Sequence, residues 1–423
     1  MKKTTNCILF LLFCIHFQYA QHTESQKSME INGHIMMDTG YDFGKIDPEW
    51  FETMRPTKIL DSDGNEYQNQ GNVFFSVRQT TLSVKNYFDT SLGDLKTVFE
   101  FDLFGSGKNA GETTFHLRHA YVQFGKFLVG QTNSVFADMD VYPNLIDFMG
   151  PNGAVFTRNI QIRYTPIATS TKTISIALER PGATGDKGEY GEEFVYASVL
   201  DDVAFRFPLP DLSAEYRYTN KWGYLELAGI LRYIKWEDKN TDAYKIQGEE
   251  LGWGLSLSTK LRMNSRINFR GAFTIGSGIQ NYMNDAAADV GTKRQYENTL
   301  TPIDGETIPL IALSSYFDIV WNLKLTSAMG YSFMNNKTTN AQLNTAYKMG
   351  QYASVNVLYA PIENMILGPE LQWGMRQNND FIGDPVFNLP AAKGNRGSDV
   401  KIQFSIRYSF NNTFYRTHKN EQN

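Results

Sequence analysis

Residues 133–156, NSVFADMDVYPNLIDFMGPNGAVF, concentrate side chains that could do chemistry. The segment carries Asp138, Asp140 and Asp147 and no lysine or arginine. Carboxylates grouped in this way can attract cations, repel anions or align polar solutes, and low-dielectric walls strengthen such fields. The segment is also more apolar than a loop surrounded by water. We therefore expect it to pack against a wall inside the protein. A surface loop with a short helix is the alternative.

The histidines offer a second opportunity for chemistry. After residue 20 they are His22, His34, His116, His119 and His418. A hydrolase needs a nucleophile, a base and an orienting group within hydrogen-bond reach, and none of these histidines lies in a recognisable catalytic motif. His116 and His119 would point to opposite faces of a strand, so they could not bind one metal together. We predict no enzymatic activity, no metal site and no cofactor.

The elements that must position these residues are best represented by residues 398–410. Apolar side chains occupy every second position of this run: Val400, Ile402, Phe404, Ile406, Tyr408 and Phe410. The positions between them are polar or charged. About 9–11 tilted residues span a bilayer as a β-strand. The run therefore fits a transmembrane strand with lipid on one face and water on the other.

The same kind of run recurs along the chain. We expect strands at residues 29–43, 73–88, 95–104, 114–124, 127–132, 158–165, 171–179, 212–219, 222–236, 251–261, 267–275, 309–317, 323–333, 353–359, 365–376 and 398–410. Their connections alternate strictly between long and short, which is typical of outer-membrane barrels. Backbone groups in hydrocarbon must all be paired, so such a sheet closes. The prediction is an all-β, 16-stranded antiparallel transmembrane β-barrel with its third long loop, residues 133–156, folded into a water-filled lumen.

The ends of the chain set its expected location. Residues 1–20 have a basic start, an apolar run and Ala20 at a plausible cleavage site, as in a cleaved signal peptide. Residues 21–28 would be a short periplasmic N-terminus, residues 29–410 the barrel and residues 411–423 a periplasmic tail. The expected location is the outer membrane of a Gram-negative type of cell.

Composition excludes other classes of protein. Both cysteines, Cys7 and Cys14, lie in the expected signal peptide, so a disulfide scaffold is excluded. Without Lys2 and Lys3, 38 basic residues stand against 45 acidic ones, a net charge of about −7. This balance argues against nucleic acid as a partner.

Strand alternation also assigns side chains to the lumen. The predicted pore-lining residues are Lys96, Glu100, Asp102, Arg118, Arg163, Arg217, Arg270, Arg376, Lys401 and Arg407. Basic and acidic groups predicted for the lumen are nearly equal in number, so net charge does not choose between anions and cations. Loop acids opposite wall arginines would set a transverse field across the pore. Alternatively, the charges pair across strands and stabilise the sheet.

Four runs in the first half of the chain resemble a known family. They are SVRQTTLSVKN, LKTVFEFDLFGSG, FHLRHAYVQFGKFLVGQTNSVFADMDVYPNLIDFMGPNG and RNIQIRYT, and together they resemble the DcaP-like family of trimeric outer-membrane porins. The resemblance covers about residues 75–165. It implies a 16-stranded barrel, a homotrimer, and diffusion of small hydrophilic, often anionic, solutes. Residues 133–156 would be the constriction loop, with Arg118, Arg158 and Arg163 near it.

Two features depart from the family pattern. The family often has an N-terminal periplasmic coiled coil, and residues 22–28 are too few for heptads. Outer-membrane barrels usually end on the last aromatic residue, whereas this chain continues past Phe410.

The sequence thus favours a passive porin with outer-membrane lipid and small hydrophilic solutes as its partners. A non-conducting adhesin or structural barrel is the first alternative, and an outer-membrane hydrolase is a less favoured one. Conductance in planar bilayers separates the porin from the blocked barrel.

Overall fold

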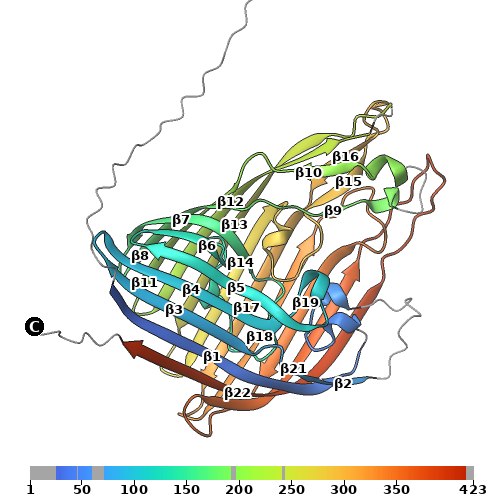
Figure 1. The fold of residues 1–423 in the computed structure, drawn as a ribbon. Helices are drawn as coiled ribbons and strands as arrows, with labels where there is room; N and C mark the ends of the chain where they lie inside the picture. The colour runs from blue at the N-terminus through green and yellow to red at the C-terminus, as the bar shows by residue number, and fades with distance from the viewer. Residues whose placement is uncertain (1–24, 45, 60–70, 192–196, 241–242, 416–423) are drawn as a thin grey trace, which may run out of the picture.

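The computed structural model describes residues 25–44, 46–59, 71–191, 197–240 and 243–415, and its main body is a β-barrel (Figure 1). Within these residues, sixteen strands form the wall: β1 (Ser25–Asp42), β3 (Thr81–Thr90), β4 (Gly93–Phe104), β5 (Thr113–Phe124), β6 (Phe127–Asn133), β7 (Arg158–Ala168), β8 (Lys172–Glu179), β11 (Asp211–Asn220), β12 (Gly223–Asp238), β13 (Gly248–Arg262), β14 (Ile267–Ser277), β17 (Pro309–Val320), β18 (Leu325–Asn336), β19 (Tyr347–Asn356), β21 (Met365–Asn378) and β22 (Arg396–Tyr415). Each wall strand pairs antiparallel with the next. The predicted 16-stranded antiparallel barrel is confirmed.

The barrel closes where its first and last strands meet. β1 and β22 pair continuously from Ser28 opposite Tyr415 to Asp42 opposite Lys401. This ladder pairs the backbone N–H and C=O groups that an open sheet would leave unpaired at its edges. In hydrocarbon, each unpaired backbone group is costly.

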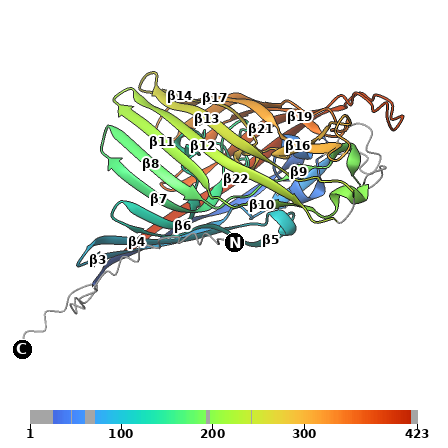
Figure 2. The same cartoon turned by 90° about the horizontal axis from the view of Figure 1, so that it is seen from above.

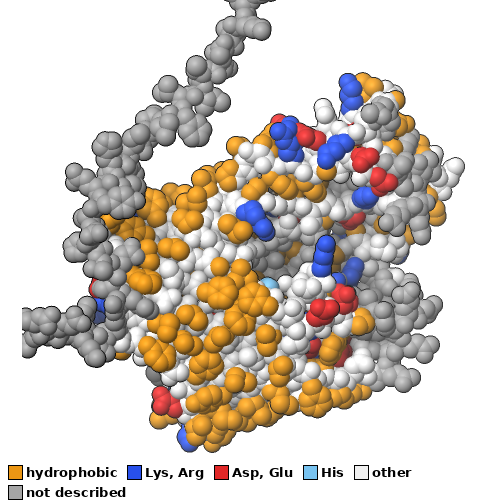
Figure 3. Space-filling model, viewed as in Figure 1, with side chains coloured by type: hydrophobic (Ala, Val, Ile, Leu, Met, Phe, Trp, Pro, Cys, Tyr) orange, Lys and Arg blue, Asp and Glu red, His pale blue; other side chains and the backbone are white. Residues whose placement is uncertain are grey.

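The wall exposes apolar side chains and buries polar ones, which is the reverse of the arrangement in a soluble protein. On β22, Ile402 is 43% exposed whereas its neighbour Lys401 is 0% exposed. Figure 3 shows hydrophobic side chains spread over the outer wall, while charged side chains gather mostly toward one end. The alternation predicted from the sequence is thus confirmed, because apolar residues face outward and polar residues are buried inside.

The two ends of the barrel differ. Short turns close the left end in Figure 1 and long connections extend from the right end. β1 begins and β22 ends at the short-turn end. The strands also exceed the predicted bounds 29–410, because Asn411–Tyr415, expected as a tail, pair with the early residues of β1. The expected signal peptide, residues 1–20, lies outside the described residues.

The run 73–88, predicted as one strand, is two. β2 (Asn72–Ser76) and β3 both pair with β1, and residues 77–80 form a turn between them. The turn lets the side chain of Arg78 enter the lumen, where it donates to Glu52 at 3.0 Å. The alternating pattern is blurred at residues 77–80 because the turn interrupts the strand there and Arg78 forms a buried ion pair.

The long connections contain structure that the sequence did not predict. β10 (Val203–Arg206) extends the wall beside β12, and β20 (Leu358–Tyr359) continues β19. β9 (Gly185–Asp186), β15 (Val290–Arg294) and β16 (Ile303–Thr307) form a separate small sheet at the long-loop end (Figure 2).

In the part of the chain that the structure describes, helical structure is limited to short 3-10 turns. They are η1 (Pro48–Trp50), η2 (Pro56–Lys58), η3 (Gly107–Asn109), η4 (Met139–Val141), η5 (Gly188–Tyr190), η6 (Ala197–Leu200) and η7 (Gln280–Tyr282). Among the described residues, none of these helices has the length and apolarity needed to cross a membrane.

Candidate functional site

The third long connection, residues 134–157 between β6 and β7, lies inside the barrel and is called the inner loop here. Its apolar residues Phe136, Val141 and Val155 are buried. Phe136 and Val155 belong to one apolar cluster with wall residues such as Ile230 and Met334. The prediction that this loop folds inward is therefore confirmed.

One end of the inner loop is held by Arg217 on β11. The guanidinium donates to Asp138 at 2.7 Å, to Glu226 at 2.5 Å and also to Asp140. Tyr224 donates to the other oxygen of Asp138 at 2.5 Å. Because Asp138 and Glu226 are buried, Arg217 compensates charges that water cannot reach.

The middle of the loop is held by Arg270 on β14. Arg270 donates to Asp318 at 2.5 Å and to the backbone oxygen of Asp140. Asp318 in turn accepts the backbone N–H of Asn144 at 3.2 Å. This pair therefore fixes the backbone of the loop as well as its side chains.

Residues 146 and 147 of the loop are held by Glu370 on β21. Its carboxylate accepts the backbone N–H groups of Ile146, at 2.8 Å, and Asp147, at 3.3 Å. Asp147 accepts a hydrogen bond from Tyr352 at 3.2 Å and lies 3.7 Å from the ammonium of Lys401. Burial raises the pKa of Asp147, and the nearby Lys401 opposes that rise.

These contacts correct one expectation. The loop acids do not stand across the lumen from wall arginines, because Asp138 and Asp140 are bonded to Arg217, and Asp147 lies beside Lys401. The pairing alternative holds for this loop, with the pairs joining loop to wall. The reason is geometric: a loop packed on the wall brings its carboxylates within contact distance of the wall cations.

A basic cavity remains on the other side of the loop. Its volume is about 210 Å³, and its lining includes His34, Arg118, Arg158 and Arg407 together with inner-loop residues from Tyr142 to Pro151. Its single acidic lining residue among the described residues, Asp147, is buried. A second cavity of about 460 Å³ shares His34 and Arg118 with it and reaches toward the start of β1.

The arginines of this cavity differ in their partners. Arg118 donates to Glu100 and Asp102, each at 2.8 Å. Arg158 and Arg407 form no ion pair with any acid in the described part of the chain. The guanidinium of Arg158 lies 4.8 Å from the ring centre of Phe156. Two of the arginines that line this cavity, Arg158 and Arg407, therefore have no acidic partner among the described residues.

Three other predicted pore-lining residues, Lys96, Arg163 and Arg376, do not line this cavity. Lys96 lies over the ring of Tyr87, and Arg163 donates to Gln161 at 3.0 Å. Arg376 donates to the backbone oxygen of Thr57 at 2.8 Å. Asp102 and Lys401, also predicted to line the pore, are 0% exposed, so they act on their neighbours and do not contact solutes.

Two further inward segments were missed from the sequence. Residues 46–59 pack Met54 and Ile59 against wall tyrosines, and Arg55 pairs with Asp285 of residues 278–289 at 2.9 Å. The predicted strands leave residues 44–71 in the long connection after the first strand. Its apolar residues, such as Trp50 and Met54, are the sequence feature that could have indicated burial.

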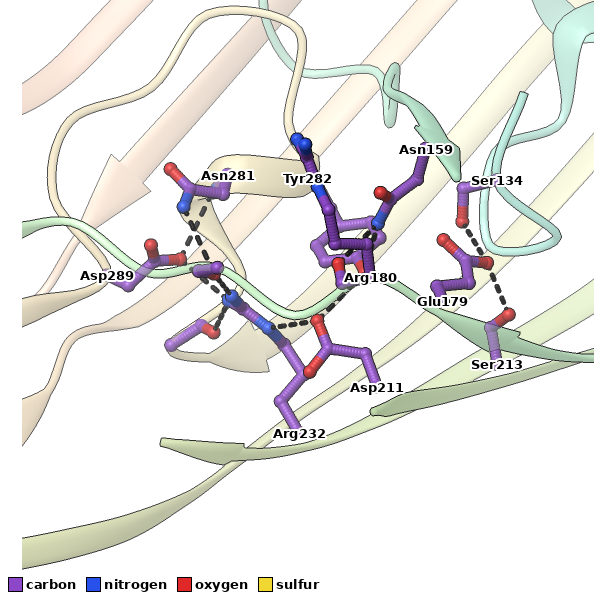
Figure 4. A network of polar contacts seen from close by, with 12 residues as sticks. Ser134, Asn159, Glu179, Arg180, Asp211, Ser213, Arg232, Asn281, Tyr282 and Asp289 are labelled. Atoms are coloured by element: carbon purple, nitrogen blue, oxygen red, sulfur yellow. Dashed lines mark hydrogen bonds and ion pairs between the residues drawn. The ribbon is translucent and has the colours of Figure 1, made fainter. Parts of the chain in front are cut away.

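A hub at Arg232 ties residues 278–289 to the wall (Figure 4). Arg232 is buried and donates to Asp211 at 3.1 Å and to Asp289 at 2.8 Å. Tyr282 donates to the same Asp211 at 2.9 Å. Beside this hub, Ser134 at the start of the inner loop donates to Glu179 at 2.8 Å. The loops in the lumen are therefore fixed by buried charge.

A second hub joins three loops at the long-loop end. Arg294 donates to Glu189 at 3.1 Å and lies 3.5 Å from Asp384, which accepts from Tyr296. Burial raises the pKa of Glu189. Burial opposes ionisation of Asp384 too, but hydrogen bonds from Tyr296 and from backbone N–H groups hold its pKa below the usual value.

Comparisons with known proteins agree on family and fold. A family profile described as "DcaP outer membrane protein" matches residues 20–384. The outer membrane channel DcaP of Acinetobacter baumannii has a similar structure, with a TM-score of 0.70, 19% identity and coverage of 90% of this chain and 97% of that one.

More distant structures share the fold. An anion-selective porin from Comamonas acidovorans has a TM-score of 0.53 and 11% identity, covering 92% of this chain and 100% of that one. The trimer form of OmpT from Vibrio cholerae has a TM-score of 0.52 and 12% identity, covering 91% and 100%. Among curated proteins, no sequence matches the chain significantly. Since the family profile matches most of the chain, this protein belongs to the DcaP outer membrane protein family.

Proposed function

We propose that the protein is an outer-membrane porin through which small hydrophilic solutes diffuse passively, with a preference for anions. The observation that carries the preference is the contrast between the loop acids and the wall arginines. Asp138, Asp140 and Asp147 each lie beside a wall cation, whereas Arg158 and Arg407 have no acidic partner in the described residues. The unpaired positive charge faces the cavity beside the inner loop.

The physical basis is the low dielectric constant of the lumen wall and the packed loop. Fixed cations in a narrow aqueous space raise the local concentration of anions and lower that of cations. Paired charges contribute little to this field because their potentials largely cancel at a distance. Selectivity should therefore depend on the uncompensated groups that lie beside the narrow part of the pore.

The test is the zero-current potential of purified protein in planar bilayers with a KCl gradient. We expect the sign that indicates chloride preference. The double variant Arg158→Gln/Arg407→Gln should lower the chloride-to-potassium permeability ratio by a factor of about 3 or more. Lys393→Gln, which changes a 90% exposed loop lysine, is the matched control and should leave the ratio unchanged. A cation-selective wild type, or an unchanged ratio in the double variant, would refute the anion preference.

The same measurement addresses the alternative classes. A properly folded protein that opens no channels would favour the non-conducting structural barrel. The hydrolase alternative has less support, because His34 contacts the backbone oxygen of Gln79 at 2.7 Å and His116 contacts Asp102 at 2.9 Å, a carboxylate that also holds Arg118. These contacts tie the histidines to the wall.

We also infer a homotrimer in the outer membrane, delivered by a signal peptide cleaved after residue 20. The apolar outer wall suits contact with lipid and with other copies. A trimer form is described for the similar OmpT of Vibrio cholerae. Light scattering of the detergent-solubilised protein should give three times the protomer mass, and N-terminal sequencing should begin at Gln21.

A further inference from the structure

An apolar pocket lies at the long-loop end of the barrel, away from the basic cavity. The ends of β10 and β12 form one side, and the small sheet β9–β15–β16 forms the other. Its volume is about 180 Å³. Its lining comprises Gly185, Asp186, Lys187, Leu200, Val203, Ala204, Phe205, Trp236, Ile246, Val290, Gly291, Thr292, Ile303, Asp304 and Gly305.

The body of the pocket is a fixed apolar surface. Trp236 is 5% exposed and packs with Val290 in one apolar cluster. Glycine lets the backbone approach the indole closely, since a Cβ added at Gly305 or Gly248 would lie 2.7 or 2.5 Å from the ring. The indole is therefore held in place by backbone.

The rim of the pocket is acidic. Asp186 accepts the backbone N–H of Gly188 at 2.9 Å and the amide of Gln342 at 2.7 Å. Asp304 accepts the backbone N–H of Gly305 at 2.8 Å, and burial raises its pKa. The lysine of the lining, Lys187, pairs with Asp201 at 3.0 Å. Asp186 and Asp304 therefore line a pocket in which the lining lysine, Lys187, already has an acidic partner.

Size and charge together define the ligand. Apolar cavities of roughly 150 Å³ bind a single benzene ring, and a lining that combines the aromatic residues Phe205 and Trp236 with carboxylates favours a cation. We propose that this pocket binds a small organic ammonium ion carrying one aromatic ring or an aliphatic group of similar size. The site is separate from the proposed anion pathway, so it adds a binding activity at the long-loop mouth and does not depend on conductance.

The experiment measures binding to the protein in lipid nanodiscs by isothermal titration calorimetry. The probe is 2-phenylethylammonium, compared with neutral toluene and with phenylacetate. We expect saturable binding of the ammonium ion, binding of toluene at least about tenfold weaker, which corresponds to 1.4 kcal/mol, and no binding of phenylacetate. Equal binding of all three probes would overturn the role of charge.

Variants locate the site. Val203→Trp fills the pocket and should abolish binding, and Asp304→Asn should weaken ammonium binding several-fold while leaving toluene binding unchanged. Asp202→Asn, an exposed neighbouring acid outside the pocket lining, is the matched control and should bind like wild type. Heat-modifiable gel mobility verifies folding of each variant. Unchanged binding in folded Val203→Trp would refute the site. Should that variant fail to fold, unchanged ammonium binding in Asp304→Asn would refute it. Neither result would test the proposed porin function.

Discussion

The inner loop has two polar sides that look alike in sequence and differ in structure. On one side, Arg217 is surrounded by Asp138, Asp140 and Glu226. On the other, Arg158 and Arg407 line the cavity without an acidic partner among the described residues. All of these arginines lie on wall strands, and the residue type is the same. Whether an arginine stabilises the loop or attracts a solute therefore depends on what the folded loop brings to it.

This difference assigns separate tasks to the two sides. A buried carboxylate needs compensation, so the Arg217 side provides energy that keeps the loop in the lumen. Arg158 and Arg407 compensate no buried carboxylate in the described residues, and both line the cavity. Stability and selectivity should accordingly respond to different substitutions.

The largest expected effect is on the paired side. Arg217→Gln leaves Asp138 and Glu226 buried without a cation, and breaking such a pair costs about 3–5 kcal/mol. Urea unfolding of the protein in detergent should show this loss. Lys393→Gln, remote and exposed, serves again as the control. A loss below about 1 kcal/mol would mean that the paired side does not hold the loop.

A smaller loss of stability is expected at Glu370, which holds residues 146 and 147 of the inner loop. Glu370→Gln removes the charge that accepts the backbone N–H groups of Ile146 and Asp147, and a lost charged hydrogen bond at a buried site costs about 1–3 kcal/mol. The loop tip should detach transiently, so single-channel recordings should show increased open-channel noise. Quiet recordings indistinguishable from wild type would contradict the anchoring role.

On the unpaired side, the main effect should be on selectivity. Arg158→Gln should reduce chloride preference while lowering the unfolding free energy by no more than about 1 kcal/mol, because the contact with the ring of Phe156 is lost but no ion pair is broken. The paired measurement of permeability ratio and urea midpoint tests the comparison directly. An Arg158 variant that loses stability as much as Arg217→Gln would abolish the distinction between the two sides.

Alternation and loop lengths were sufficient to predict the barrel and its sixteen strands, and the apolar composition of residues 133–156 predicted that the third long loop lies inside. The strands could be predicted because lipid and water impose a period of two, which is local in sequence. The partners of the charges could not be predicted in this way. Asp138 and Arg217 are 79 positions apart in the sequence, and Arg55 and Asp285 are 230 positions apart, so only the folded chain brings each pair together. The small sheet of β9, β15 and β16 escaped prediction because its strands are too short to show a pattern.

The smallest effect is expected at an exposed ion pair outside the lumen, which can be compared with the buried pairs of the inner loop. Lys27 and Asp89 form an ion pair at 3.1 Å at the short-turn end, where both side chains are at least half exposed. Water screens this pair, and its strands are already joined by the backbone ladder of β1 and β3. Asp89→Asn should therefore change neither the urea midpoint nor the permeability ratio. The same acid-to-amide change at Asp138, where the partner is Arg217 and water is excluded, should lower the midpoint clearly. If the two variants behaved alike, burial would not be what separates structural charges from functional ones in this barrel.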